Sequence, residues 1–166
     1  MLRTFLHGQL LIGILASLAN IGVHALIMAV VIWSAHRAVT VMQAARAQFR
    51  LVLVMMATVS VLMAAHLVEI VIWAVTYALV DAVPERADAL YFAFVNYTTL
   101  GYGDILPIPN WRILGPMAAM NGILLFGWST AVIYDVLRTS AQVIPLKPDG
   151  GWDAVRPALI RPEPEP

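Results

Sequence analysis

The chain has 166 residues, of which 61% are hydrophobic, and its basic and acidic residues balance to a formal net charge of zero. A mean hydropathy of +0.81 with only 12% charged residues excludes an ordinary soluble domain. The charge balance gives no support for nucleic-acid binding, and the lack of cysteine excludes disulfides and thiolate metal sites.

Three apolar stretches, residues 10–33, 51–80 and 113–137, dominate the sequence. A helix needs about 20 apolar residues to cross a bilayer core, so each stretch is long enough. The sequence therefore predicts an all-α membrane protein with three transmembrane helices, the first ending at Ser34. We do not expect the first stretch to be a cleaved signal peptide, because its apolar core exceeds the usual length of about 7–15 residues.

A basic linker without acidic residues follows the first stretch, with positive charge at Arg37, Arg46 and Arg50. Positively charged loops stay on the cytoplasmic side, so we expect the linker and the C-terminus to be cytoplasmic and the N-terminus to be outside. The expected location is the cell (plasma or inner) membrane. Membrane lipid is an expected partner, and the arginines either bind its anionic headgroups or only fix the topology.

Residues 81–86 form a polar turn that should end the second helix, and residues 87–97 form an apolar run too short to span the membrane. This run is typical of a re-entrant helix. The loop that follows it, residues 98–104, must be buried in protein or line water, because irregular backbone cannot face lipid.

Glycines alternate with larger residues in this loop. Gly101 and Gly103 can adopt backbone angles closed to other residues, so successive carbonyls can point to the same side while Leu100 and Tyr102 point into the surrounding protein. Four such loops around one axis would stack rings of carbonyl oxygens that replace the water shell of a cation. The hydroxyl of Thr99 would add a further ring.

The string Thr99-Leu100-Gly101-Tyr102-Gly103-Asp104 resembles the selectivity filter of the potassium channel family, with leucine where valine is usual. Residues 91–98 resemble the pore helix of that family, and the resemblance covers residues 50–138. Asn96 departs from the usual threonine, and Val95 stands where some members have glutamate. The resemblance implies K⁺ coordination by Thr99, Leu100, Gly101, Tyr102 and Gly103, with Thr98, Asp104 and Asn96 as filter support.

The third apolar stretch resembles the inner helix of the same family over residues 121–131. The resemblance implies that Gly122 is a hinge and that Phe126 and Thr130 line a cavity below the filter. Asn121 has two interpretations: it faces the cavity, or it makes a hydrogen bond between helices.

His66 and Glu69 lie one turn apart on the second helix and share a face. An ionisable group in a membrane helix usually faces protein. Three interpretations stay open. Glu69 braces the pore helix or filter, or it is a neutral hydrogen-bonded partner of His66 or His24, or the three residues form a metal or proton-sensing site.

We expect three regions: an additional N-terminal transmembrane helix with the basic linker (1–50), a pore domain (51–138) and a proline-rich cytoplasmic tail without regular structure (139–166). One loop supplies one quarter of a filter, so the expected unit is a homotetramer that conducts K⁺ passively. The alternatives are a weakly selective cation channel and a non-conducting membrane sensor or subunit. No catalytic arrangement stands out, so we expect no enzyme, organic cofactor, nucleic acid or soluble partner.

Overall fold

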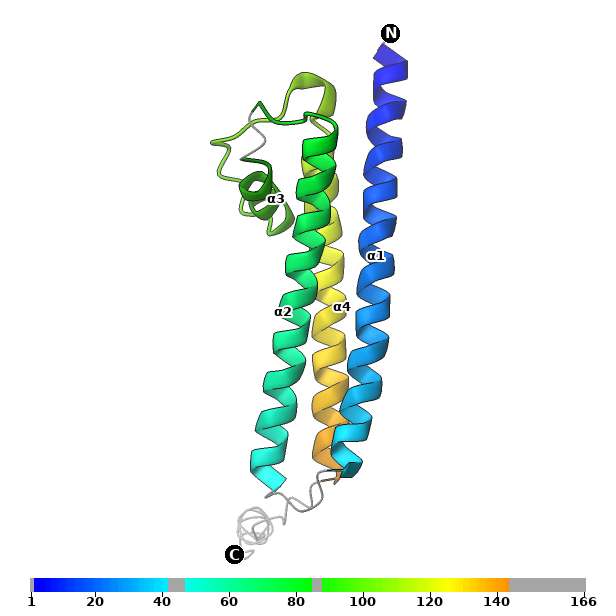
Figure 1. The fold of residues 1–166 in the computed structure, drawn as a ribbon, viewed down its shortest axis with the longest axis vertical. Coiled ribbons are helices and arrows are strands. Elements are labelled where there is room, and N and C mark those ends of the chain that lie inside the picture. The colour runs from blue at the N-terminus through cyan, green and yellow to red at the C-terminus, as the bar shows by residue number, and fades with distance from the viewer. Residues whose placement is uncertain (1, 42–46, 85–87, 144–166) are drawn as a thin grey trace, which may run out of the picture.

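The computed structural model describes residues 2–41, 47–84 and 88–143. Three long helices run side by side: α1 (Leu2–Val41), α2 (Ala47–Leu79) and α4 (Leu114–Val143). The short helix α3 (Ala89–Tyr97) and its loop pack against one end of them, and the 3₁₀ turn η2 (Pro109–Trp111) leads into α4 (Figure 1). All three long helices are long and apolar enough to cross a membrane, which confirms the predicted all-α class.

One predicted helix end is wrong, and two helices extend beyond the apolar stretches that predicted them. α1 continues to Val41 instead of ending at Ser34, α2 already begins at Ala47, and α4 continues to Val143. The expected boundary after residue 50 therefore falls inside α2, and the one before residue 139 falls inside α4. Hydropathy marks only the part of a helix that crosses hydrocarbon, whereas backbone hydrogen bonds continue into the polar interface. The rest of the proposed tail and the linker residue Arg46 lie outside the described residues.

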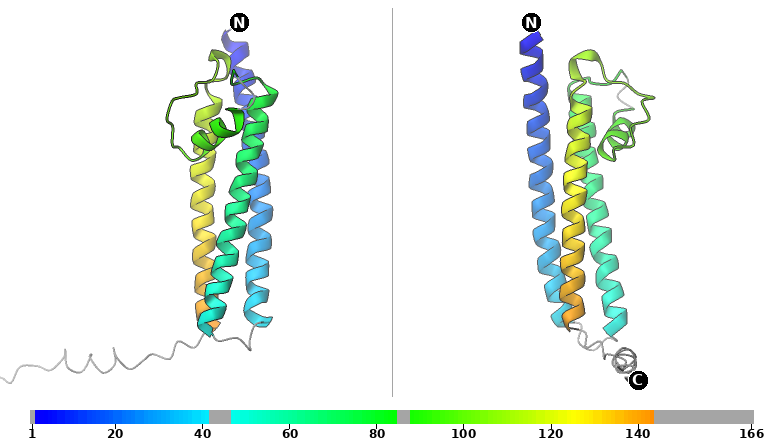
Figure 2. Two further views of the ribbon diagram at one scale, coloured as in Figure 1. Left: turned by 60° about the vertical axis from the view of Figure 1, so that its left-hand side comes forward. Right: turned by 180° about the vertical axis from the view of Figure 1, so that it is seen from behind.

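α1 lies on the opposite side of the α2–α4 pair from α3 (Figure 2). Its buried positions recur every three to four residues, and this spacing selects one helical face. This face contains polar as well as small and apolar residues, while leucines, isoleucines and valines cover the exposed faces. Polar groups face protein and apolar groups face outward, as membrane helices require. The buried residues are Gln9, Gly13, Ala16, Asn20, His24, Met28, Val31 and Ala35.

The buried interior has two apolar clusters with a polar layer between them. The cluster near α3 includes Trp73, Tyr77 and Phe92, and the cluster at the far end includes Met28 and Val132. Between them, each long helix contributes polar side chains that are buried. These are His24 of α1, His66 and Glu69 of α2, and Ser129 of α4.

The end of α2 agrees with the predicted polar turn. Asp81 has a φ of 49°, the backbone amide of Ala82 donates to the carbonyl of Tyr77 (2.9 Å), and that of Asp81 donates to Ala78 (3.4 Å). This pattern is a Schellman motif, which satisfies the last carbonyls of a helix. The carbonyl of Ala82 then accepts from the amide of Ile108 (2.9 Å), which fixes the loop after the filter to the end of α2.

Glycine allows α4 and α3 to approach very closely. A Cβ atom on Gly122 would lie 2.0 Å from the carbonyl oxygen of Tyr97, at the end of α3. Backbone occupies that space, so no side-chain rotation could relieve the overlap. The glycine that the family resemblance makes a hinge is thus also required by the packing of α3, and α4 runs as one continuous helix through it.

We expect Gly122→Ala to destabilise the protein by about 1–3 kcal/mol, because the new methyl group would push α3 away from α4. Gly127→Ala is the matched control, since this glycine lies on the same helix and a Cβ atom there would meet nothing within 4 Å. Alanine should be neutral or slightly stabilising there. Thermal unfolding in detergent would measure both variants, and equal stabilities would contradict the packing argument.

Candidate functional site

The loop after α3 has the alternating backbone that the sequence predicts. Thr99, Gly101 and Gly103 have φ values of 61°, 58° and 74°, whereas Leu100 and Tyr102 are not in the positive-φ region. Alternation of left-handed and ordinary residues turns successive peptide planes in a regular way. Thr99 is the one residue of these three that is not glycine, and a positive φ is unusual for a β-branched residue.

The side chains of the loop have little cover within one chain. Leu100 is 54% exposed and Tyr102 is 69% exposed, although both are large and apolar or aromatic. The loop is tied to α3 at its start, where the backbone amide of Gly101 donates to the carbonyl of Val95 (3.2 Å). Within one chain, both side chains are therefore mostly exposed.

Asp104, at the outer end of the loop, accepts a hydrogen bond from the hydroxyl of Tyr91 on α3 (2.7 Å). This bond stabilises the ionised carboxylate and holds the pKa of Asp104 below its ordinary value. The same bond raises the pKa of Tyr91. Asp104 was expected to support the filter, and the structure gives it a partner, Tyr91, that the sequence analysis did not single out.

Two other expected support residues bond within α3 instead of to the loop. The side-chain amide of Asn96 donates to the backbone carbonyl of Phe92 (2.8 Å). The hydroxyl of Thr98 donates to the backbone carbonyl of Phe94 (2.7 Å). Asn96 also packs against Gly115 of α4, where a Cβ would lie 2.9 Å from its side-chain oxygen. Within one chain, these residues secure the end of α3 rather than the loop itself.

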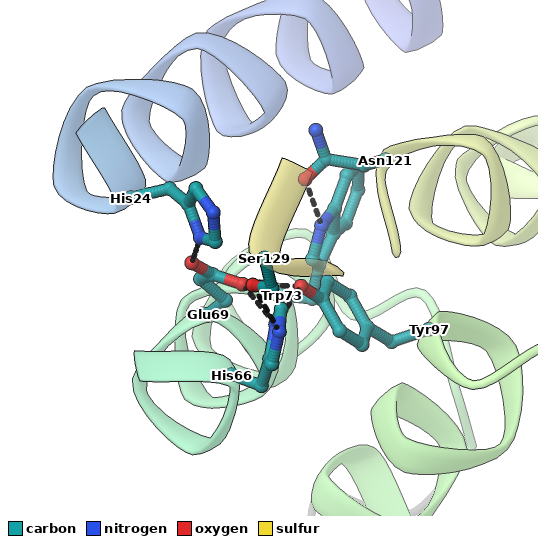
Figure 3. Close-up of polar contacts among 7 residues, drawn as sticks. All are labelled: His24, His66, Glu69, Trp73, Tyr97, Asn121 and Ser129. Atoms are coloured by element: carbon teal, nitrogen blue, oxygen red, sulfur yellow. Dashed lines mark hydrogen bonds and ion pairs between the residues drawn. The ribbon is translucent and has the colours of Figure 1, made fainter. Parts of the chain in front are cut away.

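Glu69 lies fully buried and contacts three side chains from three helices (Figure 3). One carboxylate oxygen, Oε1, lies 2.7 Å from Nδ1 of His24 on α1. The other, Oε2, lies 2.9 Å from Nδ1 of His66 and accepts a hydrogen bond from the hydroxyl of Tyr97. Glu69 therefore contacts the last residue of α3, directly before the filter loop.

His66 extends the contacts to α4. Its Nδ1 lies 3.0 Å from the hydroxyl of Tyr97 and its Nε2 lies 3.0 Å from Oγ of Ser129. Its ring also packs against Phe126, with 4.4 Å between ring centroids. Phe126 therefore lies beside the polar layer. Its side chain is still 38% exposed.

The remaining expected pore residues lie on α4. Thr130 is exposed, and its hydroxyl donates to the carbonyl of Phe126 (2.9 Å). Asn121 is buried, and its side-chain oxygen accepts from the indole nitrogen of Trp73 (3.2 Å), as Figure 3 shows. The interpretation of Asn121 as a hydrogen bond between helices therefore agrees with the structure.

Sequence reasoning missed Tyr91, Tyr97 and Ser129. The two tyrosines look like ordinary members of an apolar run, and Ser129 looks like a small packing residue. The position of Glu69 within an apolar stretch could have pointed to Tyr97, because a carboxylate buried there requires hydrogen-bond donors from facing helices. A tyrosine at the end of the pore helix could have been proposed as one of them.

Residues 65–139 match the model of a protein family described as an ion channel. The matched segment contains about half of α2, all of α3, the filter loop and most of α4, and it begins after α1. No curated protein and no solved structure matches the chain. The match supports ion channel activity of the type with two spans around a pore loop, and it favours a channel over an enzyme. Together with the three apolar helices, it indicates a multi-pass membrane protein.

We expect Tyr91→Phe to raise the pKa of Asp104 towards its ordinary value, because the carboxylate loses its hydrogen-bond donor. A lowered pKa in the folded state stabilises the loop above the unfolded-state pKa, and this contribution is lost as pH falls through the folded-state value. Carbon-13 NMR titration of Asp104 would measure the change. Tyr134→Phe, at an exposed tyrosine of α4, is the control and should leave the titration unchanged.

Proposed function

We propose that four copies of this chain form a K⁺-selective channel with residues 99–103 of each copy lining the pore. The observation that carries the proposal is the alternating backbone at Thr99, Gly101 and Gly103 within a sequence that resembles a potassium channel filter. The match of residues 65–139 to an ion channel family supports it.

The chemistry of the proposal is the replacement of water by backbone oxygens. Carbonyls of residues 99–102 and the hydroxyl of Thr99 would coordinate dehydrated K⁺ in successive rings, each built from four chains. Ions would move in single file and repel one another through the pore, down their electrochemical gradient. No bond is made or broken, so the proposal needs neither a catalytic residue nor an organic cofactor.

The tetramer follows from the incomplete site in one chain. A single loop provides one quarter of each ring, and a closed ring of identical subunits is the simplest way to complete it. Neighbouring subunits would also cover Leu100 and Tyr102, which one chain leaves exposed. Phe126 and Thr130 of α4 would then face the cavity below the filter, as expected for an inner helix.

The proposed location is the plasma or inner membrane, with the filter end and the N-terminus outside and the C-terminus in the cytoplasm. The N-terminus and the filter loop lie at the same end of the molecule (Figure 1). The opposite end carries an excess of arginine, which favours the cytoplasmic side for it: Arg37 belongs to the last turns of α1, Arg46 precedes α2, and Arg50 belongs to its first turn.

The first test is K⁺ flux from liposomes that contain the purified protein. Gly101→Ala should reduce the flux to the background rate, because an L-residue with left-handed backbone is disfavoured by about 1–2 kcal/mol in each of four copies. The control is Gly22→Ala on α1, where a Cβ atom would have no neighbour within 4 Å. Wild-type protein without flux would favour a non-conducting sensor or subunit.

The second test separates a K⁺-selective pore from a weakly selective cation pore. Reversal potentials in mixed K⁺ and Na⁺ solutions should lie close to the K⁺ equilibrium potential. A reversal potential near zero in symmetric total cation would support the weakly selective alternative. Native mass spectrometry of the same preparation measures the number of chains, and any assembly other than a tetramer would contradict the proposed pore.

A further inference from the structure

The polar layer contains a compact set of metal-ligand atoms that ion conduction does not use. His24, His66 and Glu69 each offer one ligand atom, and these atoms all lie within 4.8 Å of one another. All three residues are buried, and they come from two different helices. Both imidazoles turn the same nitrogen, Nδ1, towards the one carboxylate (Figure 3).

We propose that His24, His66 and Glu69 bind a divalent transition-metal ion of the Zn²⁺ type inside the membrane, with the hydroxyl oxygen of Tyr97 beside the site as a fourth donor. Two imidazole nitrogens and one carboxylate are a ligand set that Zn²⁺ and similar ions prefer. The proposal goes beyond the pore and does not depend on its selectivity.

The ligand atoms all lie within 4.8 Å of one another, and the two imidazoles contact different oxygens of the carboxylate, so binding of an ion requires the side chains to adjust. Bonds of about 2.0 Å in tetrahedral coordination place neighbouring ligand atoms about 3.3 Å apart. Nδ1 of His24 lies 2.7 Å from Glu69, and Nδ1 of His66 lies 2.9 Å from it. Each imidazole would therefore have to withdraw by a few tenths of an ångström (about 0.5 Å) to admit an ion.

A second layer of contacts would hold the ligands in place. Nε2 of His66 lies 3.0 Å from Oγ of Ser129, and metal-bound histidines usually hold their other nitrogen in such a bond. The ring of His24 packs against Trp128, with 5.2 Å between centroids, and lies 5.5 Å from the ring of His66. Both imidazoles are thus oriented by α4, which contributes no ligand itself.

The buried carboxylate of Glu69 requires positively charged or hydrogen-bonding partners at this position. Glu69 and His24 are fully buried at the level of the spanning segments, where an uncompensated charge is costly. Within the described residues, the imidazole of His24 makes one polar contact, from Nδ1 to Glu69. Its Nε2 has no hydrogen-bond partner among those residues. A divalent ion would offset the negative charge of the carboxylate, with one positive charge left over, and would give His24 a bond stronger than one hydrogen bond. It would also join α1 to α2 next to the end of α3.

The test is the metal content of protein purified from cells grown with added Zn²⁺, after washing with a mild chelator. We expect one ion per chain in the wild type and a loss of at least about tenfold in occupancy for His24→Asn and Glu69→Gln, because each removes a ligand. His7→Asn is the matched control, since His7 lies on the same helix outside the cluster and this variant should retain the ion.

Cobalt provides a readout that a hydrogen-bonded network would not give. Co²⁺ added to metal-free protein should produce the visible absorption of a four-coordinate site in the wild type and in His7→Asn, and none in His24→Asn. Added Zn²⁺ should raise the unfolding temperature of the wild type and of His7→Asn but not of His24→Asn, and the melting curve also shows that the last variant is folded. Folded wild-type protein without bound metal and without the cobalt spectrum would overturn the proposal.

Discussion

Tyr97 fixes the end of α3, and with it the start of the loop of residues 98–104, to α2 and α4. Its backbone carbonyl packs so closely on Gly122 that no Cβ fits between α3 and α4, and its hydroxyl bonds to Glu69. The loop begins directly after it, so the height and tilt of the loop relative to α2 and α4 depend on these two contacts. A small change at either contact would be transmitted to the loop, because backbone on one side and a buried carboxylate on the other leave little room for adjustment.

The polar layer explains why α1 is an integral part of the fold. His24 reaches Glu69 from the side of the α2–α4 pair opposite α3, while Tyr97 reaches the same carboxylate from the side of α3. Without α1, the buried carboxylate would face lipid on one side. α1 thus covers a polar centre that α3 also contacts, and it does so with a face that is more polar than its exposed surface.

The sequence predicted the parts of the structure that depend on local chemistry. Apolar length predicted the three spans, and the spacing of Gly101 and Gly103 predicted the alternating backbone of the loop. The end of α1 was predicted too early, because backbone hydrogen bonding continues where hydropathy stops. The positive φ of Thr99 was not predicted either, since β-branched residues disfavour it. The tyrosine partners were missed for another reason: the bond from Tyr91 to Asp104 and that from Tyr97 to Glu69 depend on how helices pack, which residue type alone does not reveal.

The order of residues along the chain also bears on how the protein enters the membrane. His24 belongs to α1 and Glu69 belongs to α2, so the imidazole precedes the carboxylate along the chain. Domains and segments near the N-terminus are available before later ones during synthesis. During synthesis the imidazole of His24 is therefore available before the carboxylate that it contacts.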